Sequence, residues 1–328
     1  MKAMLVGVNR ALEWKDVPDP IIKEEEVLVE IYAAALNRAD LLQRQGTYPS
    51  PPDSPEWMGL EIAGIVKVMG KKAMEKSQWK IGDKVCALLG GGGYAEMVCV
   101  HYDMLMPVPK GLTMQEASAL PEAFATSYLN LYIEGNLKSG ETAFIPAGAS
   151  GLASAAIPMV KALGSRVITS VRTREIADLI TNLRADVVID TSKQKTSEVL
   201  KEQMEQGYPI SVVMDCLGGQ DIGDSLPYMR HGGYWIVIST LAGTETTIGL
   251  RTLLTKGIHL AGSMLRNRSL EMKIRILKEL VEKVWPKIED GTIKPQIYRV
   301  LPMNRAEEAH AILERGENIG KVVLTVKS

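Results

Sequence analysis

At 328 residues the chain exceeds the usual size of one hydrophobic core, so its length favours two domains. Hydrophobic residues make up 46% of the sequence and charged residues 23%, and the formal net charge of −1 argues against a basic nucleic-acid-binding surface. No apolar run reaches the ~18 residues of a membrane span, and the apolar core after Met1 is too short for a signal peptide. We therefore expect a cytoplasmic protein with no membrane or nucleic-acid partner.

The first part of the chain contains short strand-like runs separated by glycine and proline. Residues 1–8 indicate an opening strand, and residues 26–33 alternate apolar and polar side chains as a half-buried strand does. Further runs at 62–68 and 81–88 lead to a glycine run at 90–93. Strands broken in this way predict a compact, mostly β, barrel-like domain.

After Pro121 strand-like and helical runs alternate, which predicts parallel strands joined by right-handed crossovers in a Rossmann-type doubly wound sheet. The predicted strands are 142–146, 166–170, 187–189, 211–215, 234–239 and 258–262, and the predicted helices include 154–163 and 174–183. Beyond them we expect one long helix at 270–290 and a closing strand at 321–326 that returns to the first domain.

The strand at 142–146 stops at a turn of small residues that leads directly into an alanine-rich helix. Against the dinucleotide-binding pattern Gly-x-Gly-x-x-Gly, the turn has Gly148, Ser150 and Ala153. Small residues let the backbone approach a pyrophosphate, a helix N-terminus offers N–H groups, and the Ser150 hydroxyl can bond a phosphate oxygen. The alternative is an ordinary strand–helix turn packed by small residues. The predicted phosphate contacts are Gly148, Ser150, Gly151 and Leu152.

Pro158 lies inside the helix predicted after this turn. It lacks the N–H that would bond the Ser154 carbonyl, and its ring crowds that carbonyl. We predict a kink or a loosened turn near Ser154; the alternative is that local packing absorbs the proline.

Roughly twenty residues past the turn, where an NAD-binding site usually has an acid, the chain reads Ser170-Val171-Arg172-Thr173-Arg174. Two cations beside the positive end of a helix dipole are a poor local choice without an anion. Arg172 and Arg174 therefore predict a 2′-phosphate and hence NADPH, with Ser170 and Thr173 as hydroxyl partners. The alternative is a solvated first turn of a helix.

Short motifs spread over nearly the whole chain share their order and spacing with a known family. They include Gly-Leu-Glu-Ile-Ala-Gly at 59–64, Ala-Gly-Ala-Ser-Gly at 147–151 and Asn-Ile-Gly-Lys at 318–321, with further segments at 36–48, 82–85, 91–96, 120–123 and 265–268. The chain resembles the zinc-independent quinone oxidoreductase branch of the medium-chain dehydrogenase/reductase superfamily, in particular its zeta-crystallin-like, p53-inducible quinone oxidoreductase group.

The resemblance implies an α/β fold with two domains. A groES-like, mostly β catalytic domain would comprise residues 1–122 and 265–328, and a Rossmann NADP-binding domain residues 123–264. The active site is then expected between the domains. The resemblance also implies a homodimer, commonly formed through the Rossmann sheet edge, here near residues 246–260.

The resemblance also bears on metals. Zinc-dependent relatives have a cysteine ligand where this chain has Asn37 and a histidine where it has Leu60, and the lobe for structural zinc is replaced by the loop at 71–80. The sequence has 3 widely spaced cysteines and no His-Glu-x-x-His motif. We therefore expect free thiols and no metal.

Without a Lewis acid, quinones and conjugated enones suit transfer from NADPH, because their reduced charge is delocalised. Asn37 is expected to donate to the substrate carbonyl or orient the nicotinamide, and Asp40 to fix local geometry; the alternative for both is a helix cap. Tyr48 is expected to donate a hydrogen bond or proton to the developing oxyanion, or else to cover the barrel. Thr126 resembles the threonine that contacts the nicotinamide amide, with helix packing as alternative. We expect Glu61 to be structural or to anchor a water.

Further cofactor contacts are implied by the resemblance alone. They are Ser239, Leu241, Leu265, Arg266 and Asn318. Thr191 stands where many relatives have a tyrosine near the adenosine, and Ile176 where a lysine is common, which leaves the phosphate to the arginines.

We therefore expect an NADPH-dependent quinone oxidoreductase that reduces small-molecule quinones or related electron-poor carbonyl acceptors without zinc. The alternatives are an NADPH-dependent enone or enoyl-thioester reductase and a non-catalytic NADPH-binding sensor.

Overall fold

The computed structural model describes residues 1–327; Ser328, the last residue of the expected catalytic domain, lies outside the described residues. The chain divides into two compact units. We call Met1–Ala125 with Arg266–Ser328 the terminal unit, because both chain ends contribute to it, and Thr126–Leu265 the central unit.

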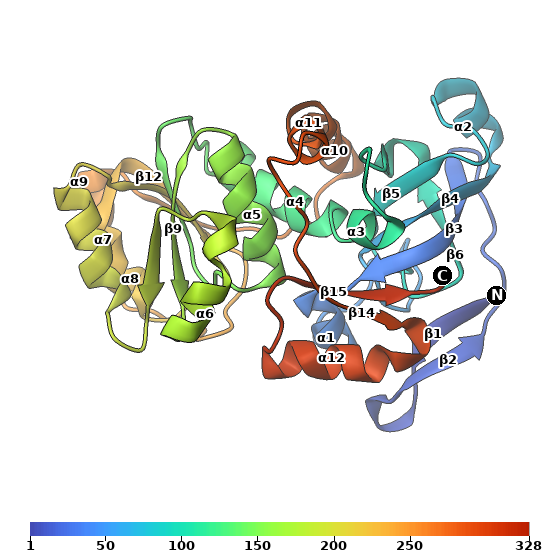
Figure 1. The fold of residues 1–328 in the computed structure, drawn as a ribbon, viewed down its shortest axis with the longest axis horizontal. Coiled ribbons are helices and arrows are strands. Elements are labelled where there is room, and N and C mark those ends of the chain that lie inside the picture. The colour runs from blue at the N-terminus through green and yellow to red at the C-terminus, as the bar shows by residue number, and fades with distance from the viewer. Residues whose placement is uncertain (328) are drawn as a thin grey trace. The chain divides into compact units, whose positions relative to one another are not determined.

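The terminal unit is built on a seven-stranded mixed sheet in the order β14-β15-β3-β4-β5-β7, with β6 also paired to β3 (Figure 1). β14 and β15 are parallel, and the other neighbours are antiparallel. A separate pair is formed by β1 and β2. The strands are β1 (Lys2–Val6), β2 (Leu12–Asp16), β3 (Glu26–Ala35), β4 (Glu61–Met69), β5 (Lys84–Leu88), β6 (Met97–His101), β7 (Leu105–Pro107), β14 (Ile297–Pro302) and β15 (Lys321–Thr325).

The closing strand returns to this sheet as predicted. β15 pairs antiparallel with β3, with Val323 opposite Ala35. Both residues are fully buried and belong to a core cluster that includes Ala33 and Ala119. The prediction of a returning C-terminal strand is confirmed, and the last segment of the chain completes a sheet that the first segment begins.

The helices of the terminal unit show one clear departure from the sequence analysis. The single helix predicted at 270–290 is wrong, because α10 ends at Lys283 and a second helix begins at Trp285. Pro286 lies in the first turn of the second helix, where its missing N–H costs nothing and its fixed φ suits a new start. The helices are α1 (Arg38–Arg44), α2 (Lys71–Lys76), α3 (Met114–Ser118), α10 (Leu270–Lys283), α11 (Trp285–Glu289) and α12 (Ala306–Arg315), with α4 (Pro121–Tyr128) at the boundary between the units.

The central unit is a six-stranded parallel sheet in the order β10-β9-β8-β11-β12-β13. Figure 1 shows α7, α8 and α9 on one side of this sheet and α5 and α6 on the other. The predicted Rossmann-type doubly wound sheet is therefore confirmed. Its strands are β8 (Thr142–Ile145), β9 (Arg166–Val171), β10 (Val187–Asp190), β11 (Ile210–Asp215), β12 (Met229–Val237) and β13 (His259–Gly262), and its helices are α5 (Gly151–Ala162), α6 (Arg174–Leu179), α7 (Thr196–Glu205), α8 (Asp221–Ser225) and α9 (Leu250–Lys256).

The strand order positions a binding site in this unit. The chain proceeds from β8 to β9 on one side, and β11 pairs with the other edge of β8. In open parallel sheets, ligands bind at the carboxyl ends of the strands at such a switch point. Phe144, Ile168, Val213 and Trp235 belong to the buried cluster that fixes these strands.

Helix α5 follows β8 and differs from its prediction in two ways. It begins at Gly151, because the Ser150 side chain caps it, rather than at residue 154. It also runs unbroken to Ala162 with Pro158 inside it, which contradicts the kink or loosened turn predicted near Ser154. Ile157 and Met159, on either side of the proline, are fully buried, and their packing holds this turn in helical form.

Candidate functional site

The turn between β8 and α5 packs closely against β9. The Gly148 N–H donates to the Ser170 carbonyl at 2.8 Å, and a Cβ on Gly148 would lie 2.5 Å from the Thr169 Oγ1. Close packing therefore requires this glycine. The left-handed residue of the turn is Ala147, with φ +57°, and not Gly148. Sequence reasoning matched Gly148 to the first glycine of the pattern and did not anticipate this strained alanine.

The N-terminus of α5 fits a phosphate group. The Ser150 Oγ accepts the Ala153 N–H at 3.1 Å, so its first role is that of a helix cap, but its own hydroxyl hydrogen remains available to a ligand. The first N–H groups of a helix have no partner within the helix, and in α5 they belong to Gly151 and Leu152. These groups and the dipole end favour an anion in front of the helix.

The predicted adenosine end lies beyond β9. Arg172 and Arg174 are both exposed, and Thr173 between them caps α6. The Arg174 Nε lies 3.0 Å from the Asp178 Oδ1, with both side chains more than half exposed. An exposed pair at this helix spacing contributes only about 0.3–0.5 kcal/mol, so an incoming phosphate can compete for the guanidinium.

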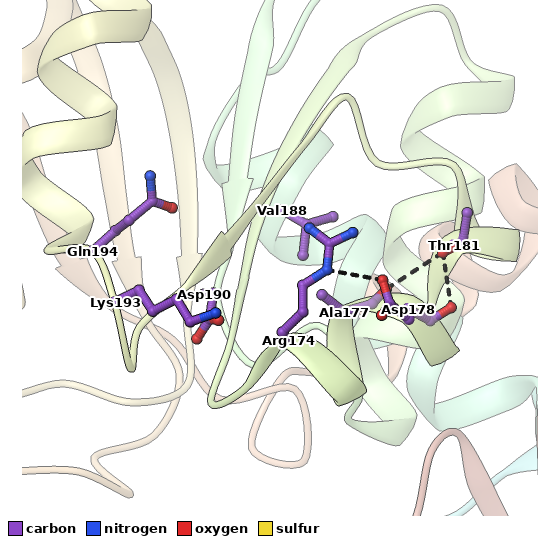
Figure 2. Close-up of a pocket in the computed structure, with 8 residues that line it drawn as sticks. All are labelled: Arg174, Ala177, Asp178, Thr181, Val188, Asp190, Lys193 and Gln194. Carbon is purple, nitrogen blue, oxygen red and sulfur yellow. Dashed lines mark hydrogen bonds and ion pairs between the residues drawn. The ribbon is translucent and has the colours of Figure 1, made fainter.

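Arg174 and Asp178 line a cavity of about 510 Å³ between α6 and the segment that follows β10 (Figure 2). Its lining residues are Arg174, Ala177, Asp178, Thr181, Val188, Asp190, Lys193 and Gln194. The volume falls in the range of small-molecule sites. Lys193 adds a cation that sequence reasoning missed, because the loop after β10 carries no recognisable motif.

Asp190, which lines this cavity, has one carboxylate oxygen whose hydrogen-bonding capacity is not satisfied. Its Oδ1 accepts the Ser192 N–H at 3.0 Å and the Ser192 hydroxyl at 2.6 Å. Its Oδ2 is buried and has no hydrogen-bond partner among residues 1–327. A buried carboxylate oxygen without a donor is costly, so this atom suits a ligand that brings an N–H group.

In the terminal unit, Asn37 is part of a buried polar cluster. The Lys321 Nζ lies 2.6 Å from Glu61 Oε1, and both side chains are almost fully buried. Lys321 also donates to the Asn37 Oδ1 at 2.8 Å, and the Asn37 Nδ2 donates to Glu61 at 3.0 Å. The other oxygen of Glu61 accepts the Glu122 N–H in the first turn of α4. The Asn37 amide is thus engaged at both ends, which does not favour its expected donation to a substrate.

Asp40 fixes local geometry, one of the roles expected for it. Its carboxylate accepts the Asn37 N–H at 2.8 Å, the Gly59 N–H at 3.1 Å and the Tyr94 hydroxyl at 3.1 Å. The first of these bonds is made at the start of α1, in agreement with the helix-cap alternative. Burial raises the pKa of Asp40 to about 6, and the three donors oppose that rise.

Tyr48 and Arg266, which are far apart in sequence, lie together. The Arg266 Cζ lies 4.9 Å from the centre of the Tyr48 ring, and its Nη1 donates to the Tyr48 carbonyl at 3.3 Å. Arg266 is therefore directed to a loop of the terminal unit, and not left free as expected for a cofactor contact. Tyr48 itself is half-buried, and burial raises the pKa of its hydroxyl.

The remaining predicted residues lie in separate places. Thr126 is a half-buried residue of α4, and Ser170 is buried in β9. Ser239 and Leu241 follow β12, and Leu265 is the last residue of the central unit. The Asn318 amide donates to the Gly320 carbonyl at 2.7 Å and so stabilises its own loop.

Among residues 1–327, no three His, Cys, Asp or Glu side chains gather closely enough to hold a metal ion. No helix in the same range combines the length and apolarity needed to cross a membrane.

Comparisons with known proteins agree with this architecture. Residues 23–110 match the alcohol dehydrogenase GroES-like domain, and residues 183–324 match the zinc-binding dehydrogenase family. A quinone oxidoreductase of Sus scrofa is 28% identical over 313 residues, which cover 94% of this chain and 92% of that protein. The quinone oxidoreductase of Thermus thermophilus, whose structures include a complex with NADPH, superposes with a TM-score of 0.81 at 28% identity over 99% of this chain and 100% of that one. An NAD-dependent alcohol dehydrogenase superposes with a TM-score of 0.84 at 25% identity over 99% of this chain and 100% of that one.

The matches cover both units, and the relatives span nearly the full length of the chain. The GroES-like and Rossmann architectures found in the structure are those of the matched families. This chain is an oxidoreductase of the medium-chain dehydrogenase/reductase superfamily, similar to its quinone oxidoreductases.

Proposed function

We propose that the protein is an NADPH-dependent oxidoreductase that reduces quinones or related electron-poor carbonyl acceptors without zinc. The observation that carries the proposal is the pair of exposed arginines, Arg172 and Arg174, directly after β9. β9 is the neighbour of β8, which leads into the phosphate-binding turn. One edge of the sheet thus offers N–H groups for a diphosphate and guanidinium groups for a further phosphate. Relatives that bind NADPH or act on quinones support this assignment.

When bound, NADPH supplies a hydride. The N–H groups of Gly151 and Leu152 and the Ser150 hydroxyl would bind its diphosphate, and Arg172 and Arg174 would bind the 2′-phosphate. The unsatisfied oxygen of Asp190 would accept an N–H group of the nucleotide. Thr126 would contact the nicotinamide amide, as the resemblance implies.

Two positions support a reaction without zinc. Asn37 and Leu60 present an amide and a hydrocarbon side chain where the zinc-dependent relatives have ligands. The Asn37 amide is also bonded to Lys321 and Glu61. An acceptor whose reduced charge is delocalised needs no Lewis acid, which favours quinones over simple ketones.

The substrate class is tested by steady-state turnover of o- and p-quinones against crotonyl-type thioesters, each with NADPH. We expect quinones to be the better substrates. A preference for thioesters would replace this proposal by the enoyl-thioester reductase alternative. Tight NADPH binding with no turnover of either class would favour the non-catalytic sensor.

The cofactor preference is tested with the double variant Arg172→Ala/Arg174→Ala. Each lost charge-assisted hydrogen bond removes about 1.5–3 kcal/mol. The Kd for NADPH should therefore rise by at least about tenfold, whereas the Kd for NADH should change little. Lys201→Ala, on the exposed face of α7, is the matched control and should leave both constants unchanged. Equal losses for the two cofactors would exclude the 2′-phosphate assignment.

We further propose a homodimer formed through β13. β13 is the edge strand of the central sheet, and its residues His259–Gly262 are exposed. On α9, Leu250 is 72% and Leu254 81% exposed. An open strand edge beside exposed leucines is a typical association surface.

Light scattering coupled to gel filtration tests the dimer. The wild-type protein should have twice the mass of the chain, and Leu254→Glu should convert it to a monomer. Ile81→Glu, at another well-exposed apolar site in the terminal unit, should leave the mass unchanged. A monomeric wild type would refute the proposal. Cys86, Cys99 and Cys216 are not joined by disulfides, and we propose the cytoplasm as the compartment.

A further inference from the structure

Arg266 is a buried cation whose hydrogen bonds all lead to one region of the terminal unit. It is only 7% exposed. Its Nε donates to the Gly90 carbonyl at 2.8 Å, and its Nη2 donates to Gln43 Oε1 at 2.9 Å and Ser50 Oγ at 3.2 Å. Acceptors around the edge of a planar guanidinium hold it in one orientation.

The same guanidinium holds Tyr48 at two points. It donates to the Tyr48 carbonyl at 3.3 Å, and it lies over the Tyr48 ring at 4.9 Å, within the range of a cation–π contact. Gln43 is itself fixed, because its Nε2 donates to the Ser50 Oγ and to the Glu56 carbonyl, both at 2.8 Å. Both the backbone and the ring direction of Tyr48 are therefore set by Arg266.

The charged groups around Tyr48 shift the pKa of its hydroxyl in opposite directions. Burial raises the pKa of its hydroxyl, the Glu122 carboxylate raises it further, and Arg266 lowers it. Lys273 donates to the Arg266 carbonyl at 2.7 Å, and Asp40 also interacts with the Arg266 charge. The hydroxyl thus remains protonated at neutral pH, and Arg266 is the group that favours the phenolate when the proton leaves.

We propose that Arg266 is a positioning residue, which aims Tyr48 as the proton donor of the reduction and stabilises the phenolate that remains. This inference rests on the proposed function. It also replaces the sequence expectation that Arg266 contacts the cofactor.

The step balances in atoms and electrons. Two-electron reduction of a quinone to a hydroquinone requires one hydride, from NADPH, and one proton. The O–H bond of Tyr48 breaks, a new O–H bond forms on the substrate oxygen, and water then returns a proton to the phenolate. The net change is NADPH, a proton and quinone to NADP⁺ and hydroquinone.

The test compares Arg266→Met, which removes the charge, with Arg266→Lys, which keeps the charge but loses the planar fork. Tyr48→Phe serves to assign the signal of Tyr48 in spectra of protein labelled with ¹³C at the ζ carbon of tyrosine. Arg275→Met is the matched control, since Arg275 is an exposed residue of α10 paired with Glu279. For each variant, the measurements are the Kd for NADPH, kcat and KM for a quinone between pH 6 and about 10, and the pKa of Tyr48 by NMR.

We expect Arg266→Met to raise the pKa of Tyr48 further, because the nearby positive charge is lost, and to lower kcat by at least about tenfold, with the Kd for NADPH unchanged. In Arg266→Lys the pKa of Tyr48 should return part of the way to its wild-type value, and kcat should recover to a smaller extent. The Tyr48→Phe/Arg266→Met double variant should be no slower than Tyr48→Phe, because both changes remove one function.

A large rise in the Kd for NADPH in Arg266→Met would instead make Arg266 a cofactor ligand and overturn the inference. An unchanged titration of Tyr48 in both variants would overturn it as well. If the wild-type protein reduces no quinone, the proposed function fails, whereas the NMR titration still decides whether Arg266 controls Tyr48. If Arg266→Met does not fold, Arg266→Lys carries the same comparison.

Discussion

Ala147 shows how a single residue can hold a strained conformation beside a binding site. Its φ of +57° is the left-handed region, which costs a residue with a Cβ about 1–2 kcal/mol. The strain persists because the neighbouring Gly148 is held against β9 by its hydrogen bond to Ser170. Such strained residues cluster at ligand sites, and Ala147 lies in the turn proposed to face the diphosphate.

Replacing Ala147 by glycine relieves this strain. We expect Ala147→Gly to leave the free energy of unfolding unchanged or to raise it by up to about 1 kcal/mol. The control is Ala155→Gly, inside α5, where the same substitution should cost about 1 kcal/mol. Urea unfolding of both variants checks the contrast, and a clear destabilisation by Ala147→Gly would contradict it.

His310 is expected to make the free energy of unfolding depend on pH in the acidic range. It is fully buried on α12, neither ring nitrogen has a hydrogen-bond partner among residues 1–327, and its ring meets that of Tyr94 edge-on at 6.0 Å. Burial lowers the pKa of His310 from 6.5 to about 4. Between these values the unfolded chain binds the proton more tightly, so stability falls as the pH drops below 6.5.

At pH 5 this group should cost about 2 kcal/mol of stability relative to neutral pH. His310→Leu should remove that part of the acid sensitivity, as measured by urea unfolding between pH 7.5 and about 5. His231→Gln, at an exposed position of β12, should leave the pH dependence unchanged. An unaltered pH profile in His310→Leu would show that another group is responsible.

Many of the site residues predicted from the sequence lie in local motifs, whereas the contacts that join distant parts of the chain were not predicted. The turn at Gly148–Leu152 and the two arginines stand within one strand–helix–strand unit, where spacing alone carries information. The contact between Arg266 and the Tyr48 carbonyl spans 218 residues, and that between Lys321 and Asn37 spans 284. No local sequence pattern predicts such pairs. A lysine at the start of an apolar strand, such as Lys321, nevertheless indicates a buried partner of opposite charge.

At the level of elements, one ion pair joins four segments of the terminal unit. Glu61 begins β4 and Lys321 begins β15, while Asn37 precedes α1 and the Glu122 N–H belongs to α4. Lys321 gives its three hydrogens to Glu61, Asn37 and the Leu36 carbonyl. Because both charges are buried, each is stable only while the other is present.

Lys321→Met should therefore lower the free energy of unfolding by about 3–5 kcal/mol, since it leaves the Glu61 carboxylate buried and unpaired. Adding Glu61→Gln should recover part of this loss, so that the two changes together cost less than their sum. Lys201→Met, which breaks an exposed pair on α7, should cost no more than about 0.5 kcal/mol. Additive effects of the two buried substitutions would refute the coupling.

The strands of the central unit were predictable, because buried parallel strands separated by helices give a strong sequence pattern. The interruption between α10 and α11 was not predicted, since the apolar spacing continues through Val284 and Trp285, both buried. Pro286 was the signal in the sequence that a new helix begins there. At Pro158 the error was the opposite one, because a kink or loosened turn was predicted where tertiary packing keeps the helix continuous. A proline thus ends a helix or not according to what surrounds it.

At the level of the whole molecule, the central unit is formed by one continuous segment of the chain and the terminal unit by two. All six strands of the central sheet lie within Thr126–Leu265, whereas the sheet of the terminal unit needs strands from both sides of that segment. We expect residues 126–265 expressed alone to fold cooperatively, and residues 1–125 alone to remain unfolded because β14 and β15 are missing. Circular dichroism and urea unfolding of the two fragments test this. A cooperative transition in fragment 1–125 would contradict the second expectation.

The pairing of β15 with β3 has a consequence for folding during synthesis on the ribosome. Along one edge, residues Ala33 to Ala35 of β3 pair with Val323 to Thr325 of β15, which are made much later in translation. At about 5–20 residues per second, nearly 290 residues of translation separate the two strands by roughly 15–60 s. Through that interval the nascent chain exposes an unsatisfied stretch of backbone, to which a chaperone or a neighbouring nascent chain can attach.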